Sequence, residues 1–401
     1  MTTGNLCRST AIASLFTIAF LSVGVRSSEP APATSPTPSL INWVNDYAFP
    51  EALQFCGEDV PVGQSDVRER IEVQVHVYSR NVGLVEIWFR RKSRYFMMFE
   101  RILREMGLPD DLKYASVIES ALQRRALSSA GAVGPWQFIE STGKEYGMRI
   151  DEYVDERLNV EIATRAALSF LKDLHSEFGS WPLALAAYNI GESRILRECY
   201  KQGTSSYYEM LLPNETDRYV MNIIAAKLIM ERPEQFGIRT EHLTPFVEPE
   251  SVSRPVEIRR STPLSVIAWC TGLSYREFTL LNPWFVNDHL KAGTYTMRLP
   301  VPGQKDFETK LDRYLSDTRD TVELKKSARF RVTVDAGEMR IGPGTAYPLI
   351  RTVPKGETFG VEGHTSEKDR GNYWYFFRKD KDFTGWIWGG QVEKMSTEKS
   401  K

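Results

Sequence analysis

The chain has little cysteine, little histidine and almost no excess of charge. Its 401 residues include 4 cysteines and 5 histidines, and the formal net charge is −1. The histidines are scattered and form no close metal-ligand pair, which argues against a zinc site, so we expect no metal and no cofactor. A near-neutral chain also lacks the positive field that recruits nucleic acid, and nucleic-acid enzymes are therefore disfavoured.

A hydrophobic run long enough to span a membrane is missing from the N-terminus. The apolar run from Ala11 to Val25 falls short of the roughly 20 residues that a helical span needs. It follows Arg8 and precedes small residues at Ser27, a pattern typical of a secretory signal peptide. We expect residues 1–27 to be a cleaved export signal, with an uncleaved anchor as the alternative. The protein is then periplasmic or associated with the cell envelope.

The few cysteines leave little room for a disulfide framework. Cys7 precedes the apolar run, so it is not the lipidated cysteine of a lipoprotein, which would follow that run. Removal of the signal leaves Cys56, Cys199 and Cys270, and an odd number permits one disulfide or none. Because Cys199 and Cys270 lie in apolar helical stretches, we favour buried thiols.

Length and composition indicate a globular protein of several domains. A chain of 401 residues exceeds one ordinary domain, and a composition of 42% hydrophobic and 26% charged residues supports packed cores. Residues 28–42 are rich in proline, alanine, serine and threonine, which predicts a semi-rigid linker.

Helical patterns dominate residues 43–240. Apolar residues at helical spacing predict helices over Glu86–Met106, Leu158–Glu177 and Asp217–Glu231. Gly179 ends the second of these, and Pro182 begins another at its favoured first position. No convincing strand pattern is present, so we predict one all-α domain.

The pattern changes after residue 252, and the whole chain is predicted to be a multidomain α+β protein. Residues 252–302 give a strand, two short helices and a second strand, a small βααβ module. Residues 303–327 predict a connecting helix and linker. Residues 328–396 carry turn signals between short segments rich in β-branched and aromatic residues, which suggests a small all-β barrel.

One carboxylate stands out in the helical region. Leu112, Ala115 and Glu119 are spaced by three and four residues, so they share one face of a helix. A carboxyl held against apolar surface has a raised pKa, which suits the protonated acid that glycoside cleavage needs. On this pattern alone, a solvated glutamate at the edge of the helix remains an equal alternative.

Further motifs accompany this glutamate in a fixed order. They are Glu119-Ser120, the loop from Gly131 to Phe138, Ala187-Tyr-Asn-Ile-Gly191, and Glu215-Thr-Asp-Arg-Tyr-Val220. Together they resemble the four motifs of the family 1 lytic transglycosylases, whose SLT domain has a lysozyme-like α-helical fold. The likeness is strongest to the multidomain branch of the membrane-bound lytic transglycosylase D type, and it covers roughly residues 84–231.

The resemblance implies roles for individual residues. Glu119 matches the single catalytic acid, and Trp136 is expected to pack or to stack on sugar. The residues implied to bind or support the substrate are Ser128, Gln137, Tyr188, Asn189, Glu215 and Tyr219. Each also has an ordinary structural interpretation. Ser128 could be a cap, Asn189 a turn residue, Gln137 a surface amide, Glu215 a helix-start carboxylate favoured by the dipole, and the two tyrosines core aromatics.

Two residues depart from the family pattern. Pro135 stands where the family usually has leucine or isoleucine, and Ile190 stands where it usually has alanine. Proline fixes φ and removes one backbone donor, and Ile190 adds bulk near Tyr188. Both concern substrate details more than the type of reaction.

The implied reaction cleaves peptidoglycan between N-acetylmuramic acid and N-acetylglucosamine and leaves a 1,6-anhydro end. One rival is a muramidase-type hydrolase on the same fold, which needs a second carboxylate or an ordered water. Glu140 or Glu145 can supply that carboxylate only if it reaches the cleft. The other rival is a non-catalytic wall-binding scaffold, which needs none of the motif residues.

The C-terminal modules resemble wall-binding domains. Residues 252–302 are similar to a LysM-like module, although Arg260-Ser-Thr262 replaces the usual Gly-Asp. The segment Arg340-Ile-Gly-Pro-Gly344 together with Gly385-Trp-Ile387 is similar to a bacterial SH3-like domain. The partners so implied are glycan strands and, through the SH3-like domain, stem peptides. The oligomeric state is left open.

Overall fold

A computed structural model describes residues 49–301, 304–324, 328–378 and 384–395. The chain divides into two compact units, Met1–Glu248 and Pro249–Lys401. The expected signal at 1–27 and linker at 28–42 lie outside the described residues. In the described ranges, no helix is both long and apolar enough to cross a membrane.

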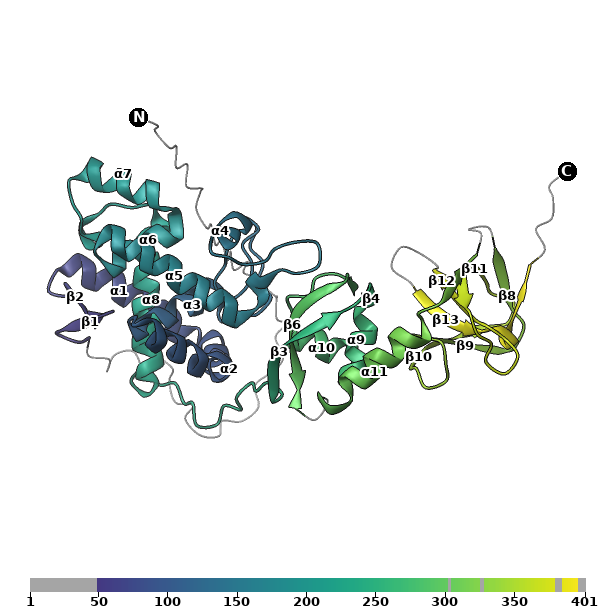
Figure 1. The fold of residues 1–401 in the computed structure, drawn as a ribbon. Helices are drawn as coiled ribbons and strands as arrows, with labels where there is room; N and C mark the ends of the chain where they lie inside the picture. Colours follow the sequence, from purple (N-terminus) through teal and green to yellow (C-terminus); the bar gives the residue numbers. More distant parts are fainter. Residues whose placement is uncertain (1–48, 302–303, 325–327, 379–383, 396–401) are drawn as a thin grey trace, which may run out of the picture. The chain divides into compact units, whose positions relative to one another are not determined.

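The first unit is helical apart from one small hairpin (Figure 1). Its elements are β1 (Leu53–Phe55), β2 (Glu58–Val60), α1 (Ser65–Arg80), α2 (Val82–Met106), α3 (Lys113–Ser120), α4 (Glu140–Glu145), α5 (Val160–Phe178), α6 (Trp181–Ile190), α7 (Glu192–Gln202) and α8 (Asn214–Glu231). The prediction of a helical domain is thus confirmed, although the hairpin means that the domain is not all-α.

Capping residues explain where the long helices begin and end. α2 begins four residues earlier than predicted because the side chain of Asn81 accepts a hydrogen bond from the Leu84 amide at 3.3 Å. Gly107 and Gly179 adopt left-handed φ values of +66° and +67° directly after α2 and α5. α6 begins at Trp181, so Pro182 is its second residue rather than its first.

The hairpin of β1 and β2 corrects the prediction that this region contains no strand. Each strand has three residues, too few for an alternating pattern to stand out. The turn between them uses Cys56 and Gly57 at φ values of +54° and +80°, and the Cys56 amide donates to Asp111 Oδ2 at 2.8 Å.

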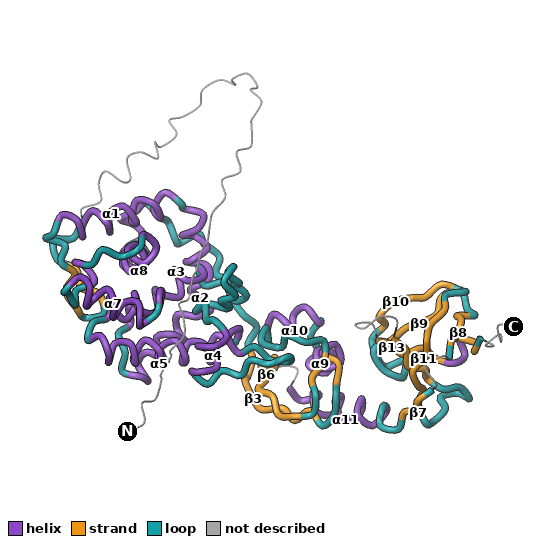
Figure 2. The backbone as a smooth tube through the Cα atoms, turned by 90° about the horizontal axis from the view of Figure 1, so that it is seen from above, coloured by secondary structure: helices purple, strands orange, loops and turns teal. Residues whose placement is uncertain are grey.

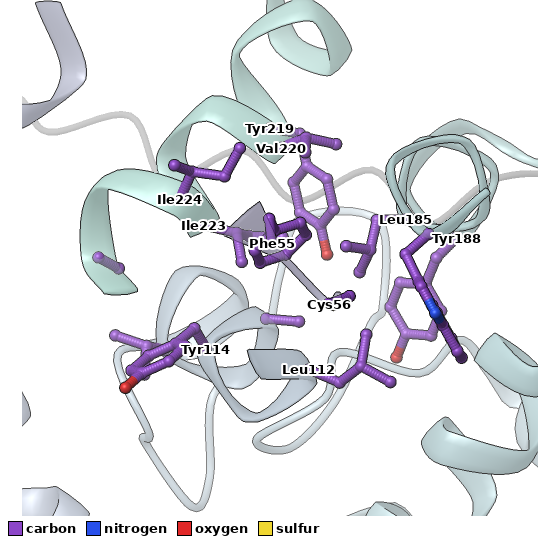
Figure 3. Close-up of a cluster of buried hydrophobic side chains, with 14 of the residues drawn as sticks. Phe55, Cys56, Leu112, Tyr114, Leu185, Tyr188, Tyr219, Val220, Ile223 and Ile224 are labelled. Atoms are coloured by element: carbon purple, nitrogen blue, oxygen red, sulfur yellow. The ribbon is translucent and has the colours of Figure 1, made fainter. Parts of the chain in front are cut away.

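The core of the first unit forms around α8. This helix contacts α1, α3 and α6, and Figure 2 shows it inside the helical unit. Val220, Ile223 and Ile224 are 0% exposed. Figure 3 shows their side chains gathered with Phe55 of the hairpin and with aromatic residues of neighbouring helices. The same packing that builds the core therefore fixes the relative positions of α3, α6 and α8.

The second unit begins with paired strands and helices. Its first elements are β3 (Ser251–Ile258), β4 (Thr262–Pro263), α9 (Leu264–Thr271), α10 (Tyr275–Leu281), β5 (His289–Leu290), β6 (Gly293–Pro300) and α11 (Gln304–Asp317). β3 and β6 pair antiparallel along their full length. The expected connecting helix is α11, and it packs its buried stripe of Phe307, Leu311 and Tyr314 on α9.

The rest of the second unit is a sheet. Its strands are β7 (Thr321–Glu323), β8 (Arg329–Val332), β9 (Ala336–Arg340), β10 (Leu349–Pro354), β11 (Thr358–Thr365), β12 (Trp374–Arg378), β13 (Thr384–Trp388) and β14 (Val392–Lys394). They pair in the order β10-β9-β13-β12-β11-β8-β14, with β7 on β11. The prediction of a β-rich region is confirmed. In the described residues the end strands β10 and β14 do not pair with each other, so no closed barrel is found.

The cysteines of the described residues are free thiols. Cys270 is buried as predicted, and burial raises its pKa to about 12. Cys199 is only half-buried, although it too was expected in a core position.

Two valines of α1 test whether this helix buries the face that contacts α8. Val75 is 2% exposed and Val77 is 55% exposed. We expect Val75→Ala to lower the free energy of unfolding by about 2 kcal/mol, and Val77→Ala to change it by less than about 0.5 kcal/mol. Urea unfolding of both variants measures this difference, and equal losses would contradict the packing of α1.

Candidate active site

Glu119 lies in the last turn of α3 and is fully buried. Its exposed fraction is 0%, as are those of Leu112 and Ala115 on the same face. The solvated-edge alternative for Glu119 is therefore wrong. Helical spacing placed the carboxyl with the apolar residues, and the structure keeps it there.

The backbone turns sharply after α3. Ala121 and Leu122 have φ values of +50° and +59°, a left-handed conformation that costs a residue with a Cβ about 1 kcal/mol. Arg91 of α2 donates through Nη1 to the Ala121 carbonyl at 2.9 Å. This contact helps to hold the strained turn, and with it the end of the helix that carries Glu119.

α8 supplies a hydrogen-bond donor to the buried carboxyl. The Tyr219 hydroxyl donates to Oε1 of Glu119 at 2.5 Å. Both residues are buried, and the distance is that of a strong hydroxyl–carboxylate hydrogen bond. Since α3 and α8 are in contact, the core packing brings together two residues that are far apart in the sequence.

Tyr188 of α6 approaches the same site but uses its hydroxyl differently. The Tyr188 hydroxyl donates to the Trp136 carbonyl at 2.7 Å. Figure 3 shows Tyr188 and Tyr219 in one buried cluster. The hydroxyl that the resemblance assigns to orienting the acid therefore holds the loop after α3.

The two tyrosines stay neutral in the folded protein. Burial, and next the charge of Glu119, raise the pKa of both Tyr188 and Tyr219 well above the usual 10. Each hydroxyl therefore keeps its proton at ordinary pH. Both remain hydrogen-bond donors, one to the carboxyl and one to the loop.

Two serines of α3 attach the loop to the helix of Glu119. Ser116 and Ser120 each donate a hydroxyl hydrogen bond of 3.0 Å to the Pro135 carbonyl. Pro135, the departure from the family pattern, lacks a backbone donor, but its carbonyl accepts both bonds. Ser116 was not predicted as a site residue, although its spacing from Ser120 places both on one face of α3.

A close backbone approach fixes the middle of the loop. Gly134 has φ +83°, and a Cβ at this position would lie 2.1 Å from the carbonyl oxygen of Arg157. The Arg157 side chain in turn donates to the Phe138 carbonyl at 3.1 Å. Trp136 is 1% exposed, and its indole donates to Thr164 of α5 at 2.9 Å, so it is a packing residue.

Gln137 has an unusual backbone and an unfilled acceptor. Its φ is +50°, its side chain is 0% exposed, and its Nε2 donates to the Gly134 carbonyl at 2.8 Å. Its Oε1 is buried without a hydrogen-bond partner among the described atoms. A buried amide oxygen without a partner is costly, so this atom is suited to accept a hydrogen bond from a ligand.

Ser128 and Asn189 each form a hydrogen bond with another part of the site. Ser128 is half-buried and accepts from the Ala132 amide at 3.0 Å, which closes the loop on itself. Asn189 is 2% exposed, and its Oδ1 accepts from the Thr216 hydroxyl at 2.9 Å. Thr216 was not predicted, yet it joins the third motif to the fourth.

Glu215 does not join the buried group. It is exposed in the first turn of α8, where a carboxylate interacts favourably with the helix dipole. The motif therefore contributes Thr216 and Tyr219 to the interior, while Glu215 faces solvent. Nothing in the described ranges offers three or more His, Cys, Asp or Glu residues to a metal ion.

Known proteins share this part of the chain. Residues 96–211 match the transglycosylase SLT domain. The matched range is less than half of the chain and includes Glu119, Gln137 and Tyr188. It ends before Tyr219, so the partner of Glu119 on α8 lies outside it.

Two curated relatives carry related descriptions. Over 233 residues the chain is 28% identical to the membrane-bound lytic murein transglycosylase D of Escherichia coli (strain K12), covering 57% of this chain and 50% of that protein. It thus spans about half the length of this relative. It is 35% identical over 153 residues to the peptidoglycan transglycosylase gp16 of Escherichia phage T7, covering 36% of this chain and 11% of that one.

A solved structure is also similar in part. It is an inactive mutant of the lytic transglycosylase Slt of Pseudomonas aeruginosa, 22% identical, covering 35% of this chain and 24% of that chain, with a TM-score of 0.30. A score this low does not establish a shared fold.

Two glycines of the loop test its close backbone approach. Gly131 and Gly134 have φ values of +78° and +83°, but only Gly134 has an atom within 4 Å of an added Cβ. We expect Gly131→Ala to cost about 1 kcal/mol of unfolding free energy from backbone strain alone. Gly134→Ala should cost at least about 2 kcal/mol more, because the Arg157 carbonyl must move. Urea unfolding that gives equal losses would contradict this contact.

The buried tyrosines predict how stability responds to alkali. Above about pH 10 the unfolded chain releases tyrosine protons that the folded chain retains. The free energy of unfolding should therefore hold below pH 10 and fall above it, by about 1.4 kcal/mol per pH unit for each buried tyrosine. Tyr188→Phe should make this slope shallower, whereas Tyr200→Phe should not, because Tyr200 is 87% exposed. Urea unfolding across this pH range measures the slopes, and equal slopes for the two variants would contradict burial of the Tyr188 hydroxyl.

Proposed function

We propose that this protein is an exported peptidoglycan lytic transglycosylase. It cleaves the β-1,4 bond between N-acetylmuramic acid and N-acetylglucosamine and leaves a 1,6-anhydro end on the muramic acid. The proposal is supported by the SLT domain match over residues 96–211 and by the lytic murein transglycosylase among the relatives. The observation that carries it is the buried carboxyl of Glu119, which accepts a hydrogen bond from Tyr219.

In the proposed reaction Glu119 acts first as an acid and then as a base. It gives its proton to the glycosidic oxygen as the bond to C1 breaks, and the N-acetyl group of the substrate assists the departing sugar. The carboxylate then takes the proton of the muramic 6-hydroxyl, whose oxygen bonds to C1. Glu119 is protonated again and no water is consumed. Attack within one sugar gains from proximity, so no enzyme nucleophile is required.

Burial of the carboxyl favours this route over hydrolysis. Glu119 is 0% exposed, so bulk water does not contact its carboxyl. A hydrolase of the inverting type also needs a second carboxylate to activate that water. The two candidates for this second carboxylate are Glu140 and Glu145 of α4. Both are exposed, and Glu140 forms an ion pair with Lys144 at 2.6 Å, whereas Glu119 is buried.

The proposed substrate contacts follow from the buried polar atoms. Gln137 accepts a hydrogen bond from a sugar through its unfilled Oε1. Tyr188 and Ser128 act by holding the loop in place, and Asn189 acts by joining the end of α6 to Thr216 of α8. Glu215, which is exposed, is proposed only as a rim contact to the glycan.

The second unit is proposed to hold the enzyme on the wall. The order of strand, two helices and strand in β3, α9, α10 and β6 supports a LysM-like glycan-binding module over 252–302. The antiparallel sheet after residue 328 supports an SH3-like domain over 328–396 that contacts stem peptides. With the helical unit as a lysozyme-like domain over 43–240, the protein acts in the periplasm or cell envelope.

Mass spectrometry of fragments released from purified sacculi tests this function. Wild type should release fragments with anhydro ends, and Glu119→Gln should reduce release by at least about a hundredfold, because it removes the general acid. Glu140→Gln is the control, since it removes a carboxylate already paired with Lys144 on the surface, and its release should match wild type.

The alternatives give distinct outcomes in the same assay. Fragments heavier by one water, with reducing ends, would replace the proposal with a hydrolase. A loss of release in Glu140→Gln would point to the two-carboxylate mechanism. Sacculi that bind wild type but yield no fragments would indicate a scaffold.

A further inference from the structure

A hollow in the second unit gathers positive side chains. It has a volume of about 390 Å³ and lies between the turn that joins β3 to β4 and the end of α11. It is lined by Arg259, Arg260, Asp312, Leu315, Ser316 and Arg319. The lining contains three guanidinium groups and one carboxylate, so its side chains carry two more positive than negative charges.

Arg259 is the guanidinium whose charge is already matched. It pairs with Asp312 at 3.0 Å, and Glu257 lies 3.8 Å away on the strand side. This pair uses the single carboxylate of the lining. The lining offers no further carboxylate to the other two arginines.

Arg260 is a half-buried cation whose hydrogen bonds all go to neutral groups. Its Nη1 donates to the Thr318 carbonyl at 2.7 Å, and its Nη2 donates to the Leu315 carbonyl at 2.5 Å and to the Thr318 hydroxyl. Burial lowers the pKa of Arg260, and the opposing effects of Tyr314 and Asp320 are smaller. A partly desolvated cation of this kind is stabilised by an anion brought close to it.

Arg319 completes the positive side of the hollow. It is exposed just beyond α11, and its side chain forms no ion pair in the part of the chain that the structure describes. Its guanidinium is therefore available to bind a ligand. Ser316 adds a hydroxyl and Leu315 an apolar contact next to it.

We propose that this hollow binds a carboxylate of the peptidoglycan stem peptide. Guanidinium groups match a carboxylate with two parallel hydrogen bonds, and the volume suits the end of a peptide. Glu257 and Asp320, which lie beside the lining, add two negative charges near these arginines, and this favours a singly charged carboxylate over a doubly charged phosphate. The proposal rests on the proposed function for the choice of peptide.

Calorimetry with the full-length wild-type chain tests this site. The probe is a stem tetrapeptide with free carboxylates, compared with the same peptide fully amidated. The free peptide should bind more tightly, and Arg319→Ala should weaken its binding about tenfold by removing one charge-assisted contact. Arg276→Ala is the matched control, because Arg276 is exposed on α10 in the same unit but does not line the hollow.

Three results would overturn the proposal. They are equal binding of the free and amidated peptides, equal losses in Arg319→Ala and Arg276→Ala, and tighter binding of inorganic phosphate than of the peptide. The peptide cannot be cleaved as a glycan, so this test is independent of catalysis. Peptide binding through Arg319 without fragment release from sacculi would reject the enzyme and keep the site.

Discussion

The hydrogen bond from Tyr219 to the buried carboxyl of Glu119 is the interaction on which the site depends. A carboxyl removed from water is stable only with a partner, and Tyr219 provides a neutral donor on the central helix α8. The position of α8 is fixed by its contacts with α1, α3 and α6. The geometry of the acid is therefore a product of the core of the whole helical unit.

The loop after α3 is tied to the same buried region by hydrogen bonds. Hydroxyls of Ser116, Ser120 and Tyr188 donate to two consecutive carbonyls, those of Pro135 and Trp136. The loop is thus held by α3, which also carries the acid, and by α6. Such a network is stabilising when its members are satisfied, and here it leaves the Gln137 oxygen as an acceptor for a ligand.

Sequence patterns predicted what depends on neighbours along the chain. Glycine stops and apolar spacing located the long helices, and the spacing of Leu112, Ala115 and Glu119 placed the acid on a buried face. Contacts between distant segments were beyond reach, because no local pattern tells which hydroxyl reaches which carbonyl. Ser116 and Thr216 were missed for this reason. The exposed helix-start position of Glu215 was the ordinary alternative to a substrate contact, and the structure shows that position. The β1–β2 hairpin was too short to show a period, and strand spacing could not tell an open sheet from a closed one.

In the proposed reaction one buried acid converts the muramic sugar into its 1,6-anhydro form without using water. The direct measurement is digestion of purified sacculi in water enriched in heavy oxygen, followed by mass analysis of the new glycan ends. We expect the new muramic ends to carry no heavy oxygen, because the 6-hydroxyl supplies the attacking atom. One heavy oxygen at each new end would contradict it and would assign the attack to water.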